Sequence, residues 1–426
     1  MSLQQDSFAL KGNICYSINP REVYCGENCY VVCAEGRSAG VFRELPEQFS
    51  KLHVYDCGDC VIIPGLTDLH THAPQFANRG MAMDLQLLDW LNTYTFPEET
   101  KFADLEYARR AYGMFVHELK QGATTRACIF ATVHVPATVW LMDELERSGL
   151  CTYVGKVNMD RNSPKELVER TADSIADTTA WLRQIDGRYS RTSPMLTPRF
   201  IPSCTDELLR ELGHMAQQYQ LPVQSHLSEN PAEVAWVKEL CPWAKTYGHA
   251  YDKWGLFGST PTIMAHCVWC PDAEMELMKK NGVTIAHSPS SNRNLSSGIA
   301  PAKDCLDAGL KIGLATDLSA GESSSILKVM SDAIAVSKLR WRYIEEQTPP
   351  LTMEEAFYMG TIGDGSFFGK VGSLEAGYEF DAVLIDDHEL IHPQELTLHQ
   401  RLERIIHLSA HCHVVKKYVR GREIFL

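Results

Sequence analysis

The chain has 426 residues, a length that allows two or three domains or one large barrel with an accessory layer. Hydrophobic residues make up 45% and charged residues 22% of it, which is typical of a globular protein and excludes a disordered one. Forty basic residues against fifty-four acidic ones leave a net charge of -14, the wrong sign for binding to phosphates. We therefore expect no nucleic acid and no membrane as a partner.

The fourteen cysteines are scattered along the chain and lack the context of a secreted protein. The opening Met-Ser-Leu-Gln-Gln-Asp has no basic region followed by an apolar run, and no apolar stretch reaches the ~18 residues of a membrane span. We expect a soluble, cytoplasmic protein with reduced thiols. The pairs Cys57/Cys60 and Cys267/Cys270 have the spacing of a zinc knuckle or redox pair, and small buried side chains are the alternative; their role stays open.

The predicted elements begin with short strands and turns over the first 60 residues, for example at 28–34 and 52–56. After them, eight short apolar runs recur with helical stretches between them. The runs lie at 61–72, 123–130, 151–157, 195–200, 222–226, 262–268, 283–288 and 311–317, and the helical stretches include 105–121, 163–183, 205–220 and 272–280. Eight strand-then-helix units predict an α/β fold, a parallel (β/α)8 TIM barrel.

Near the end of the chain the sequence again predicts strands, at 381–385 and 413–419. We expect the two chain ends, residues 1–60 and 371–426, to form one small β-sandwich packed on a catalytic barrel of residues 61–370. The segment 73–99 after the first barrel strand is unusually long, which predicts a lid over the active face.

Five potential metal ligands fall at the carboxyl ends of predicted strands, where barrel enzymes keep their active sites. Side chains alternate along a strand, so His70 and His72 point to the same side. His226, His266 and Asp317 each end a different strand. Four imidazoles and one carboxylate suit zinc, or iron(II) by the same preference, and zinc would lower the pKa of a water to ~7.

Two further side chains have a chemical interpretation and a plain structural one. Glu229 lies three residues beyond His226, so it is either a proton shuttle over the pocket or an exposed loop carboxylate. Arg199 ends the fourth predicted strand, where it either forms a salt bridge or binds a base. A planar guanidinium satisfies guanine O6 and N7 together, whereas adenine replaces O6 by a donor amine.

The segment 64–76, Pro-Gly-Leu-Thr-Asp-Leu-His-Thr-His-Ala-Pro-Gln-Phe, resembles the opening of the amidohydrolase superfamily, and of its guanine deaminases in particular. Further matches follow in order at 88–97, 197–200, 225–230, 286–292 and 316–317, so that the similarity spans nearly the whole chain. The resemblance implies a barrel of the metallo-dependent hydrolase type with one zinc per chain. Only one metal is implied because Arg199 stands where binuclear relatives carry a carboxylated lysine.

Residue roles follow from the same resemblance. It implies that His70, His72, His226 and His266 surround zinc, that Asp317 is metal-associated and the general base, and that Glu229 carries protons, with His266 in the catalytic set. Substrate binding is implied for Gln75, Arg199 and Phe200. Phe200 would either stack on the purine ring or belong to the core. Trp90 would either line the pocket or pack against a helix. We interpret His287 as a neighbour of the ligands or a wall, and His134, Glu98 and Asn292 as candidates for pocket lining.

The implied reaction is hydrolytic deamination of guanine to xanthine and ammonia, by a homodimer acting on a small purine. Departures at Ala265, Val268 and Ala315 concern pocket walls, and they leave open a related aminohydrolase of another purine, a pterin or an amino-triazine. The remaining alternative is a catalytically silent scaffold that binds partners through residues 424–426, and the complete ligand set argues against it. Phosphate-loop and dinucleotide motifs, and the signature of the cytidine-deaminase fold, are absent from the sequence.

Overall fold

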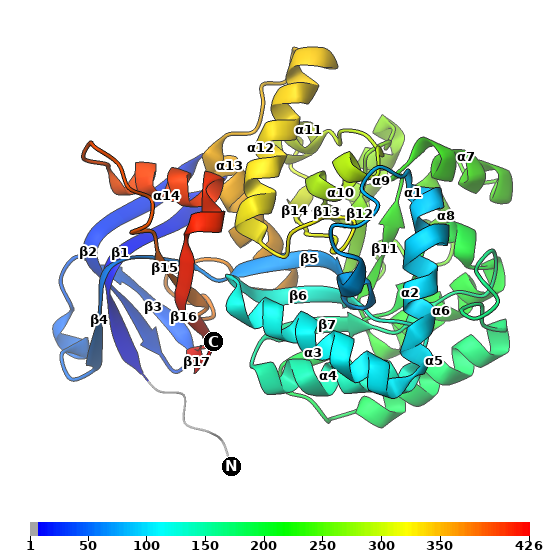
Figure 1. The fold of residues 1–426 in the computed structure, drawn as a ribbon, viewed down its shortest axis with the longest axis horizontal. Helices are drawn as coiled ribbons and strands as arrows, with labels where there is room; N and C mark the ends of the chain where they lie inside the picture. Colours follow the sequence, from blue (N-terminus) through cyan, green and yellow to red (C-terminus); the bar gives the residue numbers. More distant parts are fainter. Residues whose placement is uncertain (1–6) are drawn as a thin grey trace.

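A computed structural model describes residues 7–426; the expectation about a secretion signal concerns residues 1–6, which lie outside the described residues. Figure 1 shows the strands of both chain ends gathered on one side of the molecule and the barrel with its helices on the other. No helix among residues 7–426 combines the length and the apolar composition that a bilayer span requires.

The two chain ends meet in one mixed sheet, which has seven strands within residues 7–426 in the order β17-β16-β15-β4-β1-β2-β3. The bounds are β1 (Phe8–Asn19), β2 (Glu22–Ala34), β3 (Arg37–Phe42), β4 (His53–Pro64), β15 (Ala382–Asp386), β16 (His413–Val419) and β17 (Arg422–Ile424). Strand β4 is the junction, because it pairs parallel with β1 and antiparallel with β15. Helix α14 (Leu398–His407) buries Leu402 and Ile405 in the same apolar cluster as Cys15 and Val61 of this sheet.

The barrel strands pair in parallel throughout. They are β5 (Leu66–His72), β6 (Thr124–Phe130), β7 (Cys151–Gly155), β8 (Val157–Asn158), β9 (Thr192–Pro194), β10 (Thr197–Pro198), β11 (Val223–Leu227), β12 (Thr262–His266), β13 (Thr284–His287) and β14 (Lys311–Leu314). Backbone hydrogen bonds close the ring on both sides. Asp317 N donates to His70 O at 2.9 Å, and Leu196 N donates to Pro222 O at 2.9 Å.

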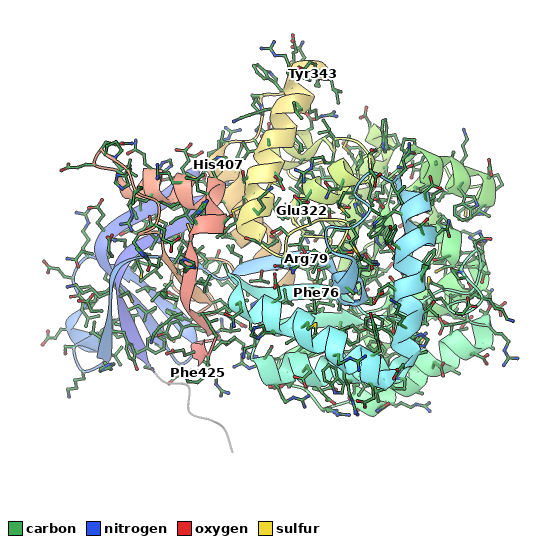
Figure 2. All side chains as sticks on the ribbon, in the orientation of Figure 1. Phe76, Arg79, Glu322, Tyr343, His407 and Phe425 are labelled. Atoms are coloured by element: carbon green, nitrogen blue, oxygen red, sulfur yellow. The ribbon has the colours of Figure 1, made fainter. Side chains whose placement is uncertain are left out.

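Helices cover the outside of the barrel (Figure 1). They are α3 (Leu105–Gln121), α4 (Val135–Ser148), α5 (Thr171–Ile185), α6 (Asp206–Tyr219), α7 (Pro231–Leu240), α8 (Tyr247–Asp252), α9 (Asp272–Asn281), α10 (Pro289–Asn294), α11 (Ala302–Asp307), α12 (Ile326–Tyr343) and α13 (Met353–Tyr358). Short turns are η1 (Glu47–Phe49), η4 (Lys101–Ala103), η5 (Ile201–Ser203), η6 (Met359–Gly363), η7 (Ser366–Phe368) and η8 (Ser409–His411). Figure 2 shows Tyr343 at the tip of α12, which projects from the body of the molecule.

The first predicted barrel strand, 61–72, is divided between two sheets. Val61 and Ile63 belong to β4 and pair with β15, and the barrel strand β5 begins at Leu66. Gly65 lies between them, and a Cβ there would be 2.3 Å from Thr125 Oγ1, so only glycine allows this approach. We therefore place the boundary between end sheet and barrel at Gly65.

Two other segments differ from the sequence prediction. The helix expected over 163–183 begins only at Thr171, because Glu169 instead accepts hydrogen bonds from Met159 N and Ser174 Oγ. The expected lid 73–99 is largely helical, formed by η2 (Ala73–Asn78), α1 (Leu87–Trp90), η3 (Leu91–Thr95) and α2 (Phe96–Thr100).

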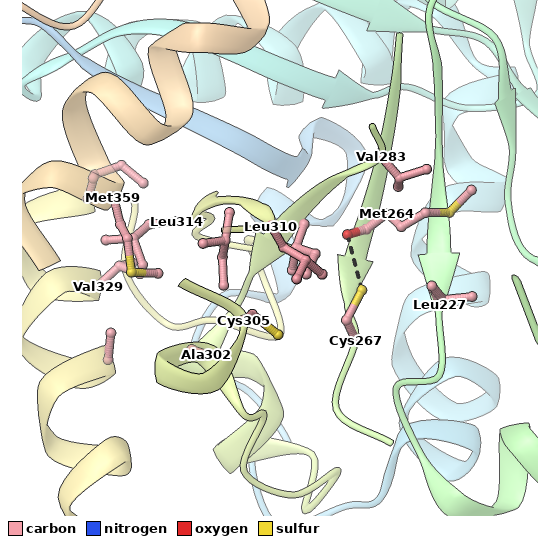
Figure 3. Close-up of a cluster of buried hydrophobic side chains, with 14 of the residues drawn as sticks. Leu227, Met264, Cys267, Val283, Ala302, Cys305, Leu310, Leu314, Val329 and Met359 are labelled. Atoms are coloured by element: carbon pink, nitrogen blue, oxygen red, sulfur yellow. Dashed lines mark hydrogen bonds between the residues drawn. The ribbon is translucent and has the colours of Figure 1, made fainter. Parts of the chain in front are cut away.

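The main apolar core fills the space between the barrel strands and the surrounding helices. Figure 3 shows part of it, in which Met264 of β12 and Leu314 of β14 belong to one cluster with Cys305 of α11 and Val329 of α12. Cys267 lies inside this cluster, and its Sγ is 3.6 Å from Met264 O. Cys267 thus packs as a small buried side chain of the barrel, whereas Cys57 and Cys60 lie on β4 of the end sheet.

Candidate active site and metal centre

The five predicted ligands converge at the carboxyl end of the barrel. Strand β5 contributes His70 and His72, β11 contributes His226, β12 contributes His266, and Asp317 follows β14. His72 Nε2 is 3.2 Å from His70 Nε2 and 3.3 Å from His226 Nε2. Asp317 Oδ1 is 3.1 Å from His70 Nε2 and 3.4 Å from His72 Nε2, and His266 Nε2 is 3.8 Å from Asp317 Oδ2. The alternation of side chains along a strand and the barrel geometry bring these atoms to one point.

The outer nitrogens of two of these histidines contact hydrogen-bond acceptors. His226 Nδ1 is 2.6 Å from the carbonyl oxygen of Arg199, and His266 Nδ1 is 2.9 Å from Asn292 Oδ1. Each Nδ1 must therefore carry the proton, which leaves the Nε2 lone pair directed at the common point. Converging lone pairs beside a buried carboxylate are a donor set that fits a cation of the zinc or iron(II) type.

The electrostatics agree with this donor set. Burial lowers the pKa of His72 and of His226 well below the usual histidine value. Burial acts to raise the pKa of Asp317, but the adjacent His70 and His266 outweigh it and hold that pKa well below its usual range. At neutral pH the site therefore offers His72 and His226 as neutral imidazoles and Asp317 as an ionised carboxylate, the states in which these groups bind a metal.

The backbone turns sharply where three of the strands end. Ser228, His266 and Asp317 have φ values of 49°, 74° and 45°, in the left-handed region that non-glycine residues rarely adopt. Such conformations persist where the surrounding structure holds them, and they concentrate at functional sites.

Glu229 lies beside the ligands and is 3% exposed. Its Oε2 is 3.4 Å from His266 Nε2, and its Oε1 accepts a hydrogen bond from Ser297 Oγ at 3.1 Å. Its backbone N–H donates to Glu233 Oε2, part of the capping box with Asn230 that begins α7. Burial, with a contribution from the charge of Asp317, raises the pKa of Glu229 to about 8. A carboxyl group in this position can hold and release a proton near neutral pH.

A cavity lies over the ligands. The five residues with expected substrate contacts all line it: Gln75, Trp90, Arg199, Phe200 and Glu229. Sequence reasoning missed its apolar wall. This wall consists of Leu87, Leu91, Leu295 and Ala320. The spacing of Leu87, Trp90 and Leu91 on one helical face is the signal that could have found half of it.

Arg199 both lines the cavity and forms a salt bridge. Its Nη1 is 2.6 Å from Glu99 Oε2, and its guanidinium carbon is 5.0 Å from the ring centroid of Phe96. Gln75 Nε2 donates to the other oxygen of Glu99 at 3.1 Å. The two interpretations of Arg199 are thus compatible, and Glu99 is a residue of the site that the sequence did not single out.

Four other candidates lie outside the cavity lining. Glu98 turns away from it and contacts Lys101 Nζ at 2.6 Å and the Tyr107 hydroxyl. His134 precedes α4 and lines a separate cavity with Phe102 and Ala137. Asn292 holds His266 instead of lining the pocket. The expectation of pocket lining is therefore wrong for these three.

The fourth candidate is His287, which is 1% exposed at the end of β13. Neither of its ring nitrogens has a hydrogen-bond partner among the described residues. Burial lowers its pKa to about 4, and the nearby His266 adds to this effect. His287 is thus a buried neighbour of the ligand His266, and it is not part of the cavity wall.

Comparison with known proteins places this geometry in a family. Residues 61–424 match the model of the amidohydrolase family. A guanine deaminase of Dictyostelium discoideum is 39% identical over 379 residues, which cover 87% of this chain and 84% of that protein. The human guanine deaminase is 36% identical over 376 residues, covering 85% of this chain and 82% of its own.

Solved structures agree with the sequence matches. The crystal structure of guanine deaminase from C. acetobutylicum, with guanine bound in its active site, superposes with a TM-score of 0.95 at 44% identity and covers 99% of this chain and 100% of that one. A triazine hydrolase at 18% identity and a TM-score of 0.83, covering 98% of this chain and 94% of its own, shares the fold. With its family model, its relatives and its converging histidines, the chain belongs to the amidohydrolase family.

Proposed function

We propose that the protein catalyses the hydrolytic deamination of guanine to xanthine and ammonia. The observation that carries this proposal is a buried guanidinium, that of Arg199, on the wall of a cavity whose floor is the cluster of histidines and Asp317. The guanine deaminases among its relatives and the guanine-bound structure of C. acetobutylicum support the same substrate.

The metal centre of the proposal holds one ion, zinc or iron(II). His70, His72, His226, His266 and Asp317 would bind it. A single ion follows because these donors surround one point, and because the end of β10 carries the cation Arg199. Such an ion would supply Lewis acidity, which would make a water in the site easier to deprotonate at neutral pH.

Substrate recognition is assigned to the cavity wall. The Arg199 side chain still has N–H donors beyond the one that contacts Glu99, and these match the O6 and N7 acceptors of guanine. Phe200 and Trp90 supply aromatic faces for the purine ring. Adenine would place a donor amine against the guanidinium, so the same wall selects against it.

Proton transfer is assigned to the two carboxyl groups of the site. Asp317 accepts the proton of the water whose oxygen adds to C2, and Glu229 delivers a proton to ring N3. Asp317 then passes its proton to the amino group, the C2–N bond breaks and ammonia leaves. The proton of the hydroxyl on C2 returns to Glu229 as this oxygen becomes the carbonyl of xanthine. One water is consumed for each guanine.

The test is ammonia release from guanine, adenine, a pterin and an amino-triazine, together with metal analysis. We expect one zinc or iron per chain, and a kcat/KM for guanine that exceeds that for adenine by at least ~10⁴-fold. Rapid turnover of a pterin or triazine without guanine turnover would overturn the substrate, and two tightly bound metals would overturn the single-ion centre.

We also propose a homodimer in the cytoplasm. Fourteen cysteines without an obvious disulfide framework support the compartment. Sedimentation equilibrium and fractionation of cells that express the protein test the two statements separately.

A further inference from the structure

Both ends of the segment between β5 and α3 meet at the carboxylate of Glu99. Gln75 comes from the start of this segment and Glu99 from its last helix, α2. Glu99 Oε1 accepts from Gln75 Nε2 at 3.1 Å, and Glu99 Oε2 accepts from Arg199 Nη1 at 2.6 Å. Glu99 is 1% exposed, Gln75 2% and Arg199 3%. One buried carboxylate thus holds two side chains that line the substrate cavity.

Helix α2 contacts the guanidinium of Arg199 through two side chains. Phe96 and Glu99 stand three residues apart, so they lie on the same face of this helix. The centroid of the Phe96 ring lies 5.0 Å from the guanidinium carbon of Arg199, while Glu99 accepts a hydrogen bond from one guanidinium nitrogen, Nη1. The plane and the rotation of the guanidinium are therefore both set by α2, and the free N–H groups keep a fixed direction.

The charge of Glu99 has a second effect. A lone guanidinium in a buried cavity would favour an anion, whereas the Arg199–Glu99 pair is neutral and suits an uncharged ligand. The contact with Glu99 also commits the amide nitrogen of Gln75, which leaves its carbonyl oxygen to accept a hydrogen bond. Guanine presents donors at N1 and at its 2-amino group.

We propose that Glu99 is a positioning residue that sets the specificity of the pocket for a neutral purine with an acceptor edge and a donor edge. It acts through Arg199 and Gln75 without being a catalytic residue. This inference rests on the proposed function, because it concerns how the same cavity recognises guanine.

The matched pair of variants is Glu99→Gln and Glu98→Gln. Both residues are buried carboxylates on α2, but Glu98 contacts Lys101 and Tyr107 outside the cavity lining. The measurements are metal content, kcat and KM for guanine, and inhibition by xanthine at pH values where it is neutral and where it is anionic. Glu99→Asp, which keeps the charge on a shorter side chain, serves as the conservative variant.

We expect Glu99→Gln to keep its metal and to raise KM for guanine by ~10- to 100-fold, the effect of a lost charged hydrogen bond, with a smaller change in kcat. The ratio of its inhibition constants for neutral and for anionic xanthine should shift at least ~10-fold in favour of the anion, because Arg199 is then unpaired. Glu99→Asp should recover part of the KM, and Glu98→Gln should keep the wild-type KM.

Three results would overturn the inference. One is a Glu99→Gln variant with the wild-type KM and the wild-type preference for neutral xanthine. Another is a Glu98→Gln variant with the same KM defect. If Glu99→Gln does not fold, a wild-type KM in Glu99→Asp together with an unshifted xanthine preference decides against it. The wild-type assay separates the two proposals: wild type inert toward guanine overturns both, whereas active wild type with an unaffected Glu99→Gln overturns only this one.

Discussion

Arg199 contacts His226 through its backbone carbonyl and Glu99 through its side chain. Its backbone carbonyl accepts the Nδ1 proton of His226, and its side chain reaches Glu99 and the cavity. In the proposed function, orientation of the metal ligand His226 and recognition of the purine would therefore start from the same residue. Because the carbonyl belongs to the backbone, a change of the side chain separates the two roles.

Replacing Arg199 by Met should leave metal binding intact while removing purine recognition. We expect kcat/KM for guanine to fall by at least ~10²-fold, since a charged hydrogen bond is lost and Glu99 is left without its cation. Elemental analysis and steady-state kinetics check the two parts. His226→Ala is the opposite control and should lose both the metal and the activity. Loss of metal from Arg199→Met would contradict the separation of roles.

Replacing Glu229 by Gln tests the proton shuttle. The amide oxygen can still accept from Ser297, so the fold and the metal should be kept, while turnover should fall at least ~100-fold because the acid is gone. Single-turnover kinetics with a parallel metal assay measure both. A variant that loses its metal would make Glu229 a ligand instead of a shuttle.

At the level of the elements, the convergence of the four histidines and Asp317 could be predicted because the barrel rule and the two-residue period of strands both act locally. The bounds of α3 were also predictable, and α6 extends between the N-cap Thr205 and the left-handed Gln220, the ends of the expected helix. The strand at 61–72 was not divided correctly, because a continuous apolar run hides the change of partner at Gly65.

The role of Glu99 could not be predicted for a different reason. Glu98 and Glu99 are the same residue type side by side, and only the helical phase of α2 decides which of them faces Arg199. That phase depends on how the whole segment 73–100 packs, and α2 itself has only five residues, too few to show a period in the sequence. Tertiary packing, and not the local sequence, therefore decides that Glu99 and not Glu98 belongs to the site.

Helix α4 holds the segment before β9 through one carboxylate. Glu146 accepts from the backbone N–H groups of Ser190, Arg191 and Thr192 at 2.9, 3.0 and 3.0 Å. Burial acts to raise its pKa, but these donors outweigh it and lower the pKa from its usual value near 4.5. The stabilisation is therefore present above about pH 4.5 and is lost as the pH falls through the lower folded-state pKa.

Glu146→Gln should accordingly reduce the free energy of unfolding by ~1 kcal/mol at pH 7, since an amide N–H₂ would face N–H donors in a partly exposed site. Urea unfolding at pH 7 and at successively lower pH measures the difference from wild type, which should shrink below pH 4.5. Glu144→Gln on the same helix should change little. A difference that grows toward acid pH would refute the assigned sign.

At the scale of the whole molecule, buried charges join the barrel to the end sheet. Arg126 on β6 contacts Asp381 at 2.7 Å and Glu379 at 2.7 Å, just before β15. On β16, Lys417 donates to three backbone carbonyls around the start of β6. These acceptors are Leu119, Gly122 and Thr124. The end sheet is thus fixed to the same strand that neighbours β5 and its histidines.

Arg126→Met should lower the free energy of unfolding by ~3–5 kcal/mol, because the charge of buried Asp381 then loses its cation and keeps, among the described residues, only the hydrogen bond from the Arg420 backbone. Thermal unfolding followed by circular dichroism measures the shift. Arg170→Met, which removes an exposed pair with Asp173, should leave the midpoint unchanged. Equal effects of the two substitutions would show that the buried pair does not join the two parts.

The junction strand β4 has a consequence for synthesis of the protein on the ribosome. One edge of β4 pairs with β1 as soon as both have emerged, but its other edge waits for β15, which is made only near the end of translation. Throughout elongation the nascent chain carries an open, apolar strand edge at Val61–Pro64, a template for aggregation. Nascent chains stalled before Ala382 should therefore depend on chaperones, and the dependence should end once β15 has been added.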